Sequence, residues 1–342
     1  MDQNNIWREQ DGIVVLTDAA AACLSRPVVT CSTAMEEQLA VLKSAADTSL
    51  RVLISGEPGT QKQQYAEYLH RCSNRAGKSY VRFDCAATRE NRLETALFGR
   101  DAMNQSYAVT GLAETAHGGT LLLDGVNALP TEFYPKLEQF LDSGLLRPQG
   151  SRSARPVDVR VVSICGQDVT AFVNQEPQAA ALMQKLGAVR IDVLPLRRRP
   201  EDIALLTVHT LQQANKRYQS QKALGSRLFR AMLDYGWPGN ERELHSFIEQ
   251  LVLVSPAAVL DDPAMLQATT RLSAALTPGL GQQTPPKQPS LREMVNAYEQ
   301  MLIQQNIRKY GSLRKAAKML GVAPSVLSRK LAAEKQRDRE NQ

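Results

Sequence analysis

The 342-residue chain contains no long apolar run, which excludes a membrane-spanning helix. Such a helix needs about 18 to 20 consecutive apolar residues, and the longest candidate, GGTLLLDG at residues 118–125, is far shorter. The first residues, MDQNNIWREQDG, also lack the basic start and apolar run of a signal peptide. We therefore expect a cytoplasmic protein that makes no contact with a membrane.

Paired cysteines are missing as well. The chain has five cysteines and none forms a C-x-x-C pair. The sequence therefore indicates neither a disulfide framework nor the ligand spacing of a zinc site. We interpret the cysteines as buried free thiols in a reducing compartment, and we expect no metal site.

Most of the chain also lacks a net charge. The net charge is +6, and residues 290–342 carry 11 Lys and Arg against 5 Asp and Glu, so the remainder is neutral. A basic carboxyl-terminal segment is typical of a protein that binds nucleic acid. A solubilising tail would have the same charge, so charge alone leaves both interpretations open.

What the sequence does contain, from about residue 30, is an alternation of apolar strands and amphipathic helices. Strands are predicted at residues 50–56, 79–86, 119–125 and 157–166, and helices at 35–46 and 62–73. This alternation predicts an α/β fold with a parallel sheet and crossover helices. After about Pro200 only helices are predicted, at residues 201–218, 226–236 and 241–254.

Residues 273–290 are rich in Pro, Gly and Gln, which is typical of a linker. Ser290 and Glu293 then form a capping box that opens a helix. This helix has a wide apolar face of six residues, Leu291, Met294, Val295, Tyr298, Leu302 and Ile303. We expect so small a domain to bury that face against a second chain, as a homodimer or a higher homo-oligomer.

Residues 311–333, GSLRKAAKMLGVAPSVLSRKLAA, have the pattern of a helix-turn-helix. Gly321 supplies the turn, and Pro324 fits the first turn of the second helix, where a missing N–H costs nothing. In a recognition helix, short polar residues reach base edges and basic residues hold phosphates. We predict binding of double-stranded DNA through Arg314, Lys315, Lys318, Ser325, Ser328, Arg329 and Lys330. The alternative is a helical hairpin with a basic solvent face.

The segment SGEPGTQKQQ, which starts at Ser55, is close to the phosphate-binding pattern G-x-x-x-x-G-K-[ST]. Gln61 stands where the pattern has its last glycine, and Gln63 where it has a hydroxyl. Four residues fall in place, Gly56, Gly59, Thr60 and Lys62. By itself the match is compatible with a working nucleotide site, an altered one or chance.

Six fragments in the same order resemble the bacterial enhancer-binding proteins, the AAA+ activators of sigma-54 RNA polymerase. They are GEPGTQK, ALFGR, GLAETAHGGTLLLDG, PLRRRPEDI, WPGNERELHSFI and the terminal helix-turn-helix of the Fis type. The resemblance spans about residue 28 to the carboxyl terminus. It implies a short extension at residues 1–29, an AAA+ P-loop α/β subdomain at 30–198, a helical lid at 199–272, a linker at 273–289 and a DNA-binding domain at 290–342.

The resemblance also implies a nucleotide site made of Gly56, Glu57, Gly59, Thr60, Lys62, Asp124 and Arg242. In the family, a glutamate follows the Walker B aspartate and polarises the attacking water, whereas Gly125 follows Asp124 here. Gln61 replaces a glycine that lets the backbone approach phosphate. Lys62 is retained, which leaves weak ATP binding open.

Two further hydrolysis elements of the family differ. An ungapped count places Ala179 and Lys185 at its arginine-finger positions, and Cys165 and Gly166 stand in its sensor strand. An arginine finger supplies about 1,000-fold or more in rate. We therefore expect no catalytic residues, no certain cofactor and no enzyme activity, with the AAA+ core acting as an assembly scaffold.

The GAFTGA loop, through which the family contacts sigma-54, is absent, because only RDAMNQSYAVT separates Gly99 from Gly111. In this the chain is similar to a sigma-54-independent branch that includes the tyrosine-responsive regulator of aromatic amino-acid genes. We expect a sequence-specific DNA-binding transcription regulator, with RNA polymerase or related enhancer-binding proteins as further partners. Two alternatives stay open, an ATP-dependent sigma-54 activator with atypical motifs and a modulator that assembles with active relatives.

Overall fold

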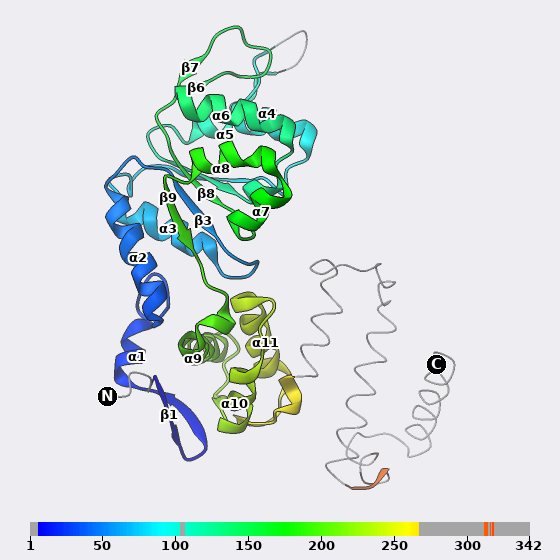
Figure 1. Ribbon diagram of the computed structural model, residues 1–342. Coiled ribbons are helices and arrows are strands. Elements are labelled where there is room, and N and C mark those ends of the chain that lie inside the picture. Colours follow the sequence, from blue (N-terminus) through cyan, green and yellow to red (C-terminus); the bar gives the residue numbers. More distant parts are fainter. Residues whose placement is uncertain (1–5, 103–106, 267–310, 314, 316, 318–342) are drawn as a thin grey trace. The chain divides into compact units, whose positions relative to one another are not determined.

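A computed structural model describes residues 6–102, 107–266, 311–313, 315 and 317 of the chain. The chain divides into two compact units, Met1–Thr270 and Arg271–Gln342. The first unit contains nearly all of the described residues (Figure 1). Within the described ranges, no helix is both long enough and apolar enough to cross a membrane.

The centre of the first unit is a five-stranded parallel sheet with the order β4-β5-β8-β3-β9. Its strands are β3 (Val52–Ser55), β4 (Tyr80–Asp84), β5 (Thr120–Asp124), β8 (Arg160–Ile164) and β9 (Val189–Asp192). β3 is buried along its whole length, as expected for a parallel strand covered on both faces. The predicted α/β fold is confirmed.

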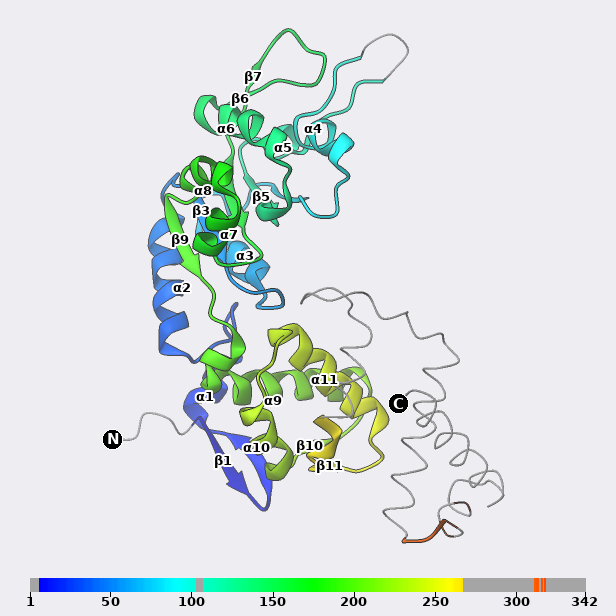
Figure 2. The same cartoon turned by 45° about the vertical axis from the view of Figure 1, so that its right-hand side comes forward.

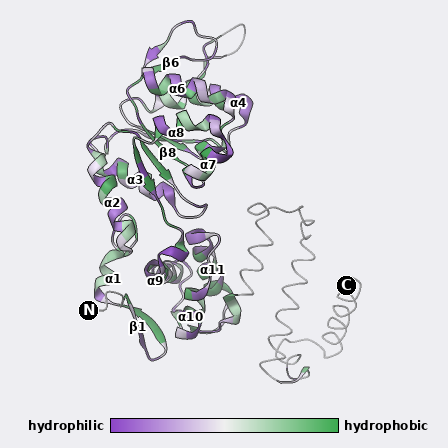
Figure 3. Cartoon of the chain, viewed as in Figure 1, coloured by the Kyte–Doolittle hydropathy of each residue, from purple (hydrophilic) through white to green (hydrophobic). Residues whose placement is uncertain are grey.

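Two apolar clusters cover the two faces of the sheet. Successive side chains of a strand point to opposite faces, so Leu121 and Leu123 belong to one cluster and Leu122 to the other. The helices of the first cluster are α4 (Glu90–Phe98), α5 (Leu112–Thr115), α6 (Tyr134–Ser143), α7 (Val169–Gln175) and α8 (Ala180–Leu186). Those of the second are α2 (Thr33–Ala46) and α3 (Lys62–Cys72). Figure 3 shows the strands of the sheet in green, among helices that mix hydrophobic and hydrophilic residues.

The helical lid follows the sheet in the same unit. Its elements are α9 (Pro200–Arg217), β10 (Ala223–Leu224), α10 (Ser226–Asp234), α11 (Asn240–Val254) and β11 (Val259–Leu260). Trp237 lies fully buried in the lid cluster, and its indole N–H donates to the backbone oxygen of Met232 at 2.9 Å. The three helices match those predicted after Pro200.

The amino-terminal segment folds onto the lid, a packing that the sequence did not reveal. An antiparallel hairpin, β1 (Trp7–Gln10) and β2 (Ile13–Leu16), precedes α1 (Asp18–Cys23). Val14 is buried in the lid cluster, and the Trp7 ring packs edge-on against Phe229, with centroids 4.8 Å apart. Figure 2 shows this hairpin beside α10.

A second hairpin, β6 (Leu145–Leu146) and β7 (Arg155–Pro156), lies at the other end of the sheet domain. Short 3₁₀ segments occur at Val126–Ala128, Thr131–Phe133, Pro177–Ala179 and Leu196–Arg198.

Only five residues of the second unit are described. Leu313, Lys315 and Ala317 have helical backbone, and the hydroxyl of Ser312 accepts the Lys315 N–H at 3.3 Å, which is the role of a helix N-cap. Lys315 is exposed and Ala317 is buried. The other six predicted DNA-binding residues, Arg314, Lys318, Ser325, Ser328, Arg329 and Lys330, lie outside the described residues, as do the linker and the apolar face at 291–303.

Candidate nucleotide-binding site

The loop between β3 and α3 depends on two glycines. Gly56 has φ 145° and Gly59 has φ 83°. A Cβ atom on Gly56 would lie 2.6 Å from the backbone oxygen of Val193, and one on Gly59 would lie 2.1 Å from that of Gly239. A side chain at position 56 would therefore push the loop away from the residue that follows β9, and one at position 59 would push it away from the lid.

Gln61 adopts the left-handed backbone that a glycine would adopt at its position. Its φ and ψ are 55° and 35°, and α3 starts at the next residue. A non-glycine residue in this region costs roughly 1–2 kcal/mol. The loop thus keeps its bend despite the substitution, and the free N–H groups of the first turn of α3 still form an anion-binding end.

Lys62 reaches back into the loop from the first position of α3. Its ammonium donates to the backbone oxygens of Gly56 at 2.8 Å and Glu57 at 2.6 Å, and it lies 3.4 Å from the Thr60 hydroxyl. Burial lowers the pKa of Lys62 to about 8. Within the described residues, this buried ammonium has three polar partners, all of them oxygens of its own loop. Such an ammonium could exchange these oxygens for phosphate oxygens when a nucleotide binds.

Asp124, at the end of β5, is held by two side chains that sequence reasoning missed. The Gln63 amide donates to its Oδ2 at 2.7 Å, and Arg82 Nη2 lies 2.7 Å from the same oxygen. Gln63 is the second residue of α3, and Arg82 alternates with buried Phe83 on β4. The period-two pattern of β4 placed Arg82 on the α3 side, but nothing in the sequence indicated its partner.

Glu57 joins the phosphate loop to the lid. Arg197 contacts both carboxylate oxygens, at 2.8 and 2.5 Å, and the Asn240 amide donates to Glu57 at 3.1 Å and to the Pro58 oxygen at 3.0 Å. The hydrogen bond from Arg197 lowers the pKa of Glu57. The Arg242 backbone N–H also donates to the Gly59 oxygen at 3.2 Å. The seven predicted nucleotide-site residues therefore occupy one connected region of loop, strand end and lid.

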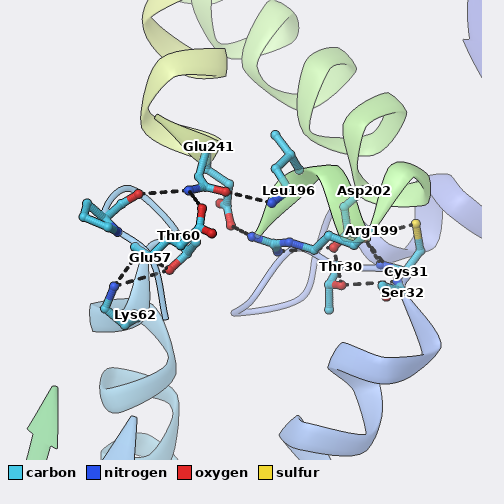
Figure 4. A network of polar contacts seen from close by, with 12 residues as sticks. Thr30, Cys31, Ser32, Glu57, Thr60, Lys62, Leu196, Arg199, Asp202 and Glu241 are labelled. Atoms are coloured by element: carbon cyan, nitrogen blue, oxygen red, sulfur yellow. Dashed lines mark hydrogen bonds and ion pairs between the residues drawn. The ribbon is translucent and has the colours of Figure 1, made fainter. Parts of the chain in front are cut away.

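A buried polar network continues from the lid toward α2 (Figure 4). Arg199 contacts Glu241 at 2.6 Å and Asp202 at 3.3 Å. Asp202 in turn accepts the Thr30 hydroxyl at 2.7 Å and the Cys31 N–H at 2.8 Å. These contacts fix the start of the lid to the residues just before α2, as a hinge between the two subdomains would require.

The remaining positions singled out in the sequence lie in the sheet domain. Gly125 has φ 79°, and the Gly166 N–H donates to the Asn127 side chain at 2.7 Å. Cys165 and Ala179 are fully buried. Lys185 forms ion pairs with Glu138 and Asp142 of α6, at 3.0 and 2.6 Å. All five cysteines are free.

Comparisons with known proteins decide the family. Residues 28–192 match the Sigma-54 interaction domain, 197–277 an AAA+ ATPase lid domain and 288–333 a helix-turn-helix domain. The regulatory protein AtoC of Escherichia coli K12 is 30% identical over 313 residues, which are 89% of this chain and 67% of AtoC. The chain belongs to the sigma-54 activator family of AAA+ transcription regulators.

Other members of the family support the same assignment. The transcriptional activator RocR of Bacillus subtilis 168 is 32% identical over 308 residues, 88% of this chain and 66% of RocR. NtrX of Brucella abortus, crystallised with ADP and with ATP, superposes with a TM-score of 0.65 at 26% identity. The two NtrX structures cover 90 and 92% of this chain, which itself covers 68 and 71% of NtrX. Against three curated relatives, the chain spans from 34 to 66% of their length.

The expectation that the chain is not an enzyme is wrong. Its AAA+ core and lid belong to a family of ATPases, and its structural relative NtrX was crystallised with ADP and ATP. The expectation treated each altered motif residue as a separate loss. At the phosphate loop, Gln61 adopts the left-handed backbone that a glycine would adopt, and Lys62 donates to the Gly56 oxygen within the loop.

Proposed function

We propose that this chain is a sequence-specific DNA-binding transcription regulator whose AAA+ core binds and hydrolyses ATP. The observation that carries the proposal is the phosphate loop. Its buried Lys62 ammonium is surrounded by loop oxygens beside the amino-terminal end of α3. A cation and free N–H groups at one helix end are the groups that hold phosphates.

The residues around the loop fit a nucleoside triphosphate. Lys62 and the α3 end face the phosphates, while Glu57, through Arg197 and Asn240, fixes the lid against the loop. The backbone N–H of Arg242, in lid helix α11, donates to the Gly59 oxygen.

ATP hydrolysis by the full chain tests this part of the proposal. We expect steady-state phosphate release by the wild type and none by Lys62→Ala. Arg198→Ala is the matched control, because Arg198 is an exposed cation of the lid junction. Equal release by the wild type and Lys62→Ala would mean that the phosphate loop is not the site.

We also propose that the chain acts on transcription without direct contact with sigma-54. In the family, the loop that makes this contact follows the segment at Gly99. Here Arg100 and Val109 exchange two backbone hydrogen bonds of 2.8 Å, which close the loop after ten residues. The match to the Sigma-54 interaction domain favours the other candidate, direct activation of sigma-54 polymerase.

A reporter at a promoter bound by the protein separates the two candidates. Regulation should persist in cells that lack sigma-54. Regulation that disappears in those cells, while the protein still occupies the promoter, would establish the direct sigma-54 candidate instead.

DNA binding is assigned to residues 290–342, the segment with the basic excess and the helix-turn-helix match. Lys315, the one described residue of the predicted DNA-binding set, is exposed on the first helix. We propose that this segment binds as a homodimer or a higher homo-oligomer. A chain that ends at residue 289 should lose promoter binding and keep ATP binding.

A further inference from the structure

Gly125 leaves the site without a carboxylate on the residue that follows Asp124. Its φ of 79° also disfavours a larger residue at that position. ATP hydrolysis nevertheless requires a group that orients the attacking water and accepts its proton. The strand beside β5 supplies a carboxylate at the same level of the sheet.

Asp84 is the direct neighbour of Asp124 across β4 and β5. The two residues are register partners at the carboxyl ends of parallel strands, so their side chains project from the same face of the sheet. Leu122, two residues before Asp124, packs in the same cluster as Tyr65 and Leu69 of α3. Asp84 therefore lies on the face that carries α3 and the phosphate loop.

Arg82 links the two carboxylates. Its Nη2 lies 2.7 Å from Asp124 Oδ2 and 3.1 Å from Asp84 Oδ2. The side chain of Asp84 is 40% exposed and that of Asp124 is 14% exposed. Asp124 is thus largely buried where it contacts Gln63 and Arg82. Asp84, which contacts the same Arg82 side chain, is more exposed to water.

Other acidic residues near the loop are engaged elsewhere in the part of the chain that the structure describes. Glu57 is held by Arg197 and Asn240. Asp192, at the end of β9 next to β3, accepts the Ser55 hydroxyl.

We infer that Asp84 is a catalytic carboxylate of this site, an inference that rests on the proposed hydrolysis of ATP. In the step, the water oxygen forms a bond to the γ-phosphorus, and the bond from that phosphorus to the bridging oxygen breaks. Its electron pair leaves with ADP. One proton of the water passes to Asp84 Oδ2 and then to solvent, which reaches this side chain.

Asp84 also has a structural contact that the experiment must keep. Its Oδ1 accepts the backbone N–H groups of Ala86 and Ala87, at 3.1 and 2.9 Å, which stabilises the turn after β4. An asparagine offers the same acceptor oxygen without the negative charge. Asp84→Asn therefore preserves the turn and removes the base.

The test compares the full wild-type chain with Asp84→Asn and with Asp158→Asn. Asp158 is a matched control because it is a surface aspartate, 67% exposed, that pairs with Arg75 away from the site. Three quantities are measured for each protein: the ATP turnover number, the dissociation constant for ATP and the midpoint of thermal unfolding. We expect the turnover number of Asp84→Asn to fall by about 100- to 10,000-fold, with the other two quantities unchanged.

The outcomes separate this inference from the function on which it rests. A wild type without turnover would overturn the proposed hydrolysis and the role of Asp84 together. A wild type with turnover and an equally active Asp84→Asn would overturn the role of Asp84 alone. Loss of ATP binding or of thermal stability in Asp84→Asn would show that the residue acts through the turn, which also overturns the inference.

Discussion

Arg199 and Glu241 form a buried ion pair of 2.6 Å that joins the start of the lid to α11. Their side chains are 1% and 6% exposed. Removing one partner of such a pair leaves the other charge buried without compensation, which costs about 3–5 kcal/mol. We therefore expect Arg199→Ala to lower the free energy of unfolding by about that amount, measured by urea titration. Arg198→Ala, an exposed neighbour, should change it by less than about 0.5 kcal/mol.

The same variant should show a pH dependence of known sign. Burial raises the pKa of Glu241, and the charge of Arg199 opposes that rise. Without Arg199 the folded chain favours the protonated carboxyl, so stability is lost as pH rises above the unfolded value of about 4.3. Arg199→Ala should thus be less destabilised at pH 5 than at pH 8. Equal loss at both values would mean that Glu241 is not the group left unpaired.

A glycine at position 61 should improve the phosphate loop. Gln61→Gly removes the roughly 1–2 kcal/mol cost of left-handed backbone, whereas Gln61→Ala removes the side chain and keeps that cost. Because the loop of the folded chain already has this backbone, the difference should appear as a higher free energy of unfolding for Gln61→Gly than for Gln61→Ala, by urea titration. Equal stabilities of the two variants would mean that the left-handed backbone carries no such cost.

ATP affinity should fall as the solution becomes alkaline. Burial lowers the pKa of Lys62 to about 8, so the ammonium is present below pH 8 and is progressively lost above it. The phosphates attract only the charged form, and affinity at pH 9.5 should therefore be lower than at pH 7. Lys62→Ala should bind weakly at both values. Wild-type affinity that does not change between them would contradict a role for the Lys62 charge.

DNA affinity should depend on salt through the basic residues of the helix-turn-helix. If Lys315, Arg329 and Lys330 contact phosphates, each change to alanine should weaken binding to all sequences and reduce the salt slope by about one unit. Ser325→Ala should alter sequence preference more than affinity. The measurement is a binding titration at several salt concentrations. Unchanged affinity in the Arg329→Ala, Lys330→Ala double variant would refute this assignment.

The sheet and lid could be predicted because their patterns are local. β3 reads VLIS and β5 reads TLLLD, each with three consecutive apolar residues, so both were visible in the sequence. β9 was missed because it is an edge strand in which one residue of four, Ile191, is buried. β9 pairs with β3, from which it is separated by more than 130 residues. A short stretch of sequence does not indicate such a distant pairing.

The candidate site divides in the same way. The loop glycines and Lys62 follow a fixed spacing and were found from sequence. Arg82 and Asn240 were not, because their partners, Asp124 and Glu57, lie far away along the chain. The left-handed backbone of Gln61 could not be read from its side chain either, since glutamine does not favour that conformation.

The packing of Trp7 on Phe229 sets an order for folding. About 220 residues separate these partners, and the whole sheet domain lies between them. A ribosome that adds 5–20 residues per second needs roughly 10–45 s to make that stretch. The β1–β2 hairpin therefore waits, with its apolar side chains uncovered, until α10 has been synthesised. The hairpin therefore reaches its native place only after the roughly 220 residues between Trp7 and Phe229 have been added.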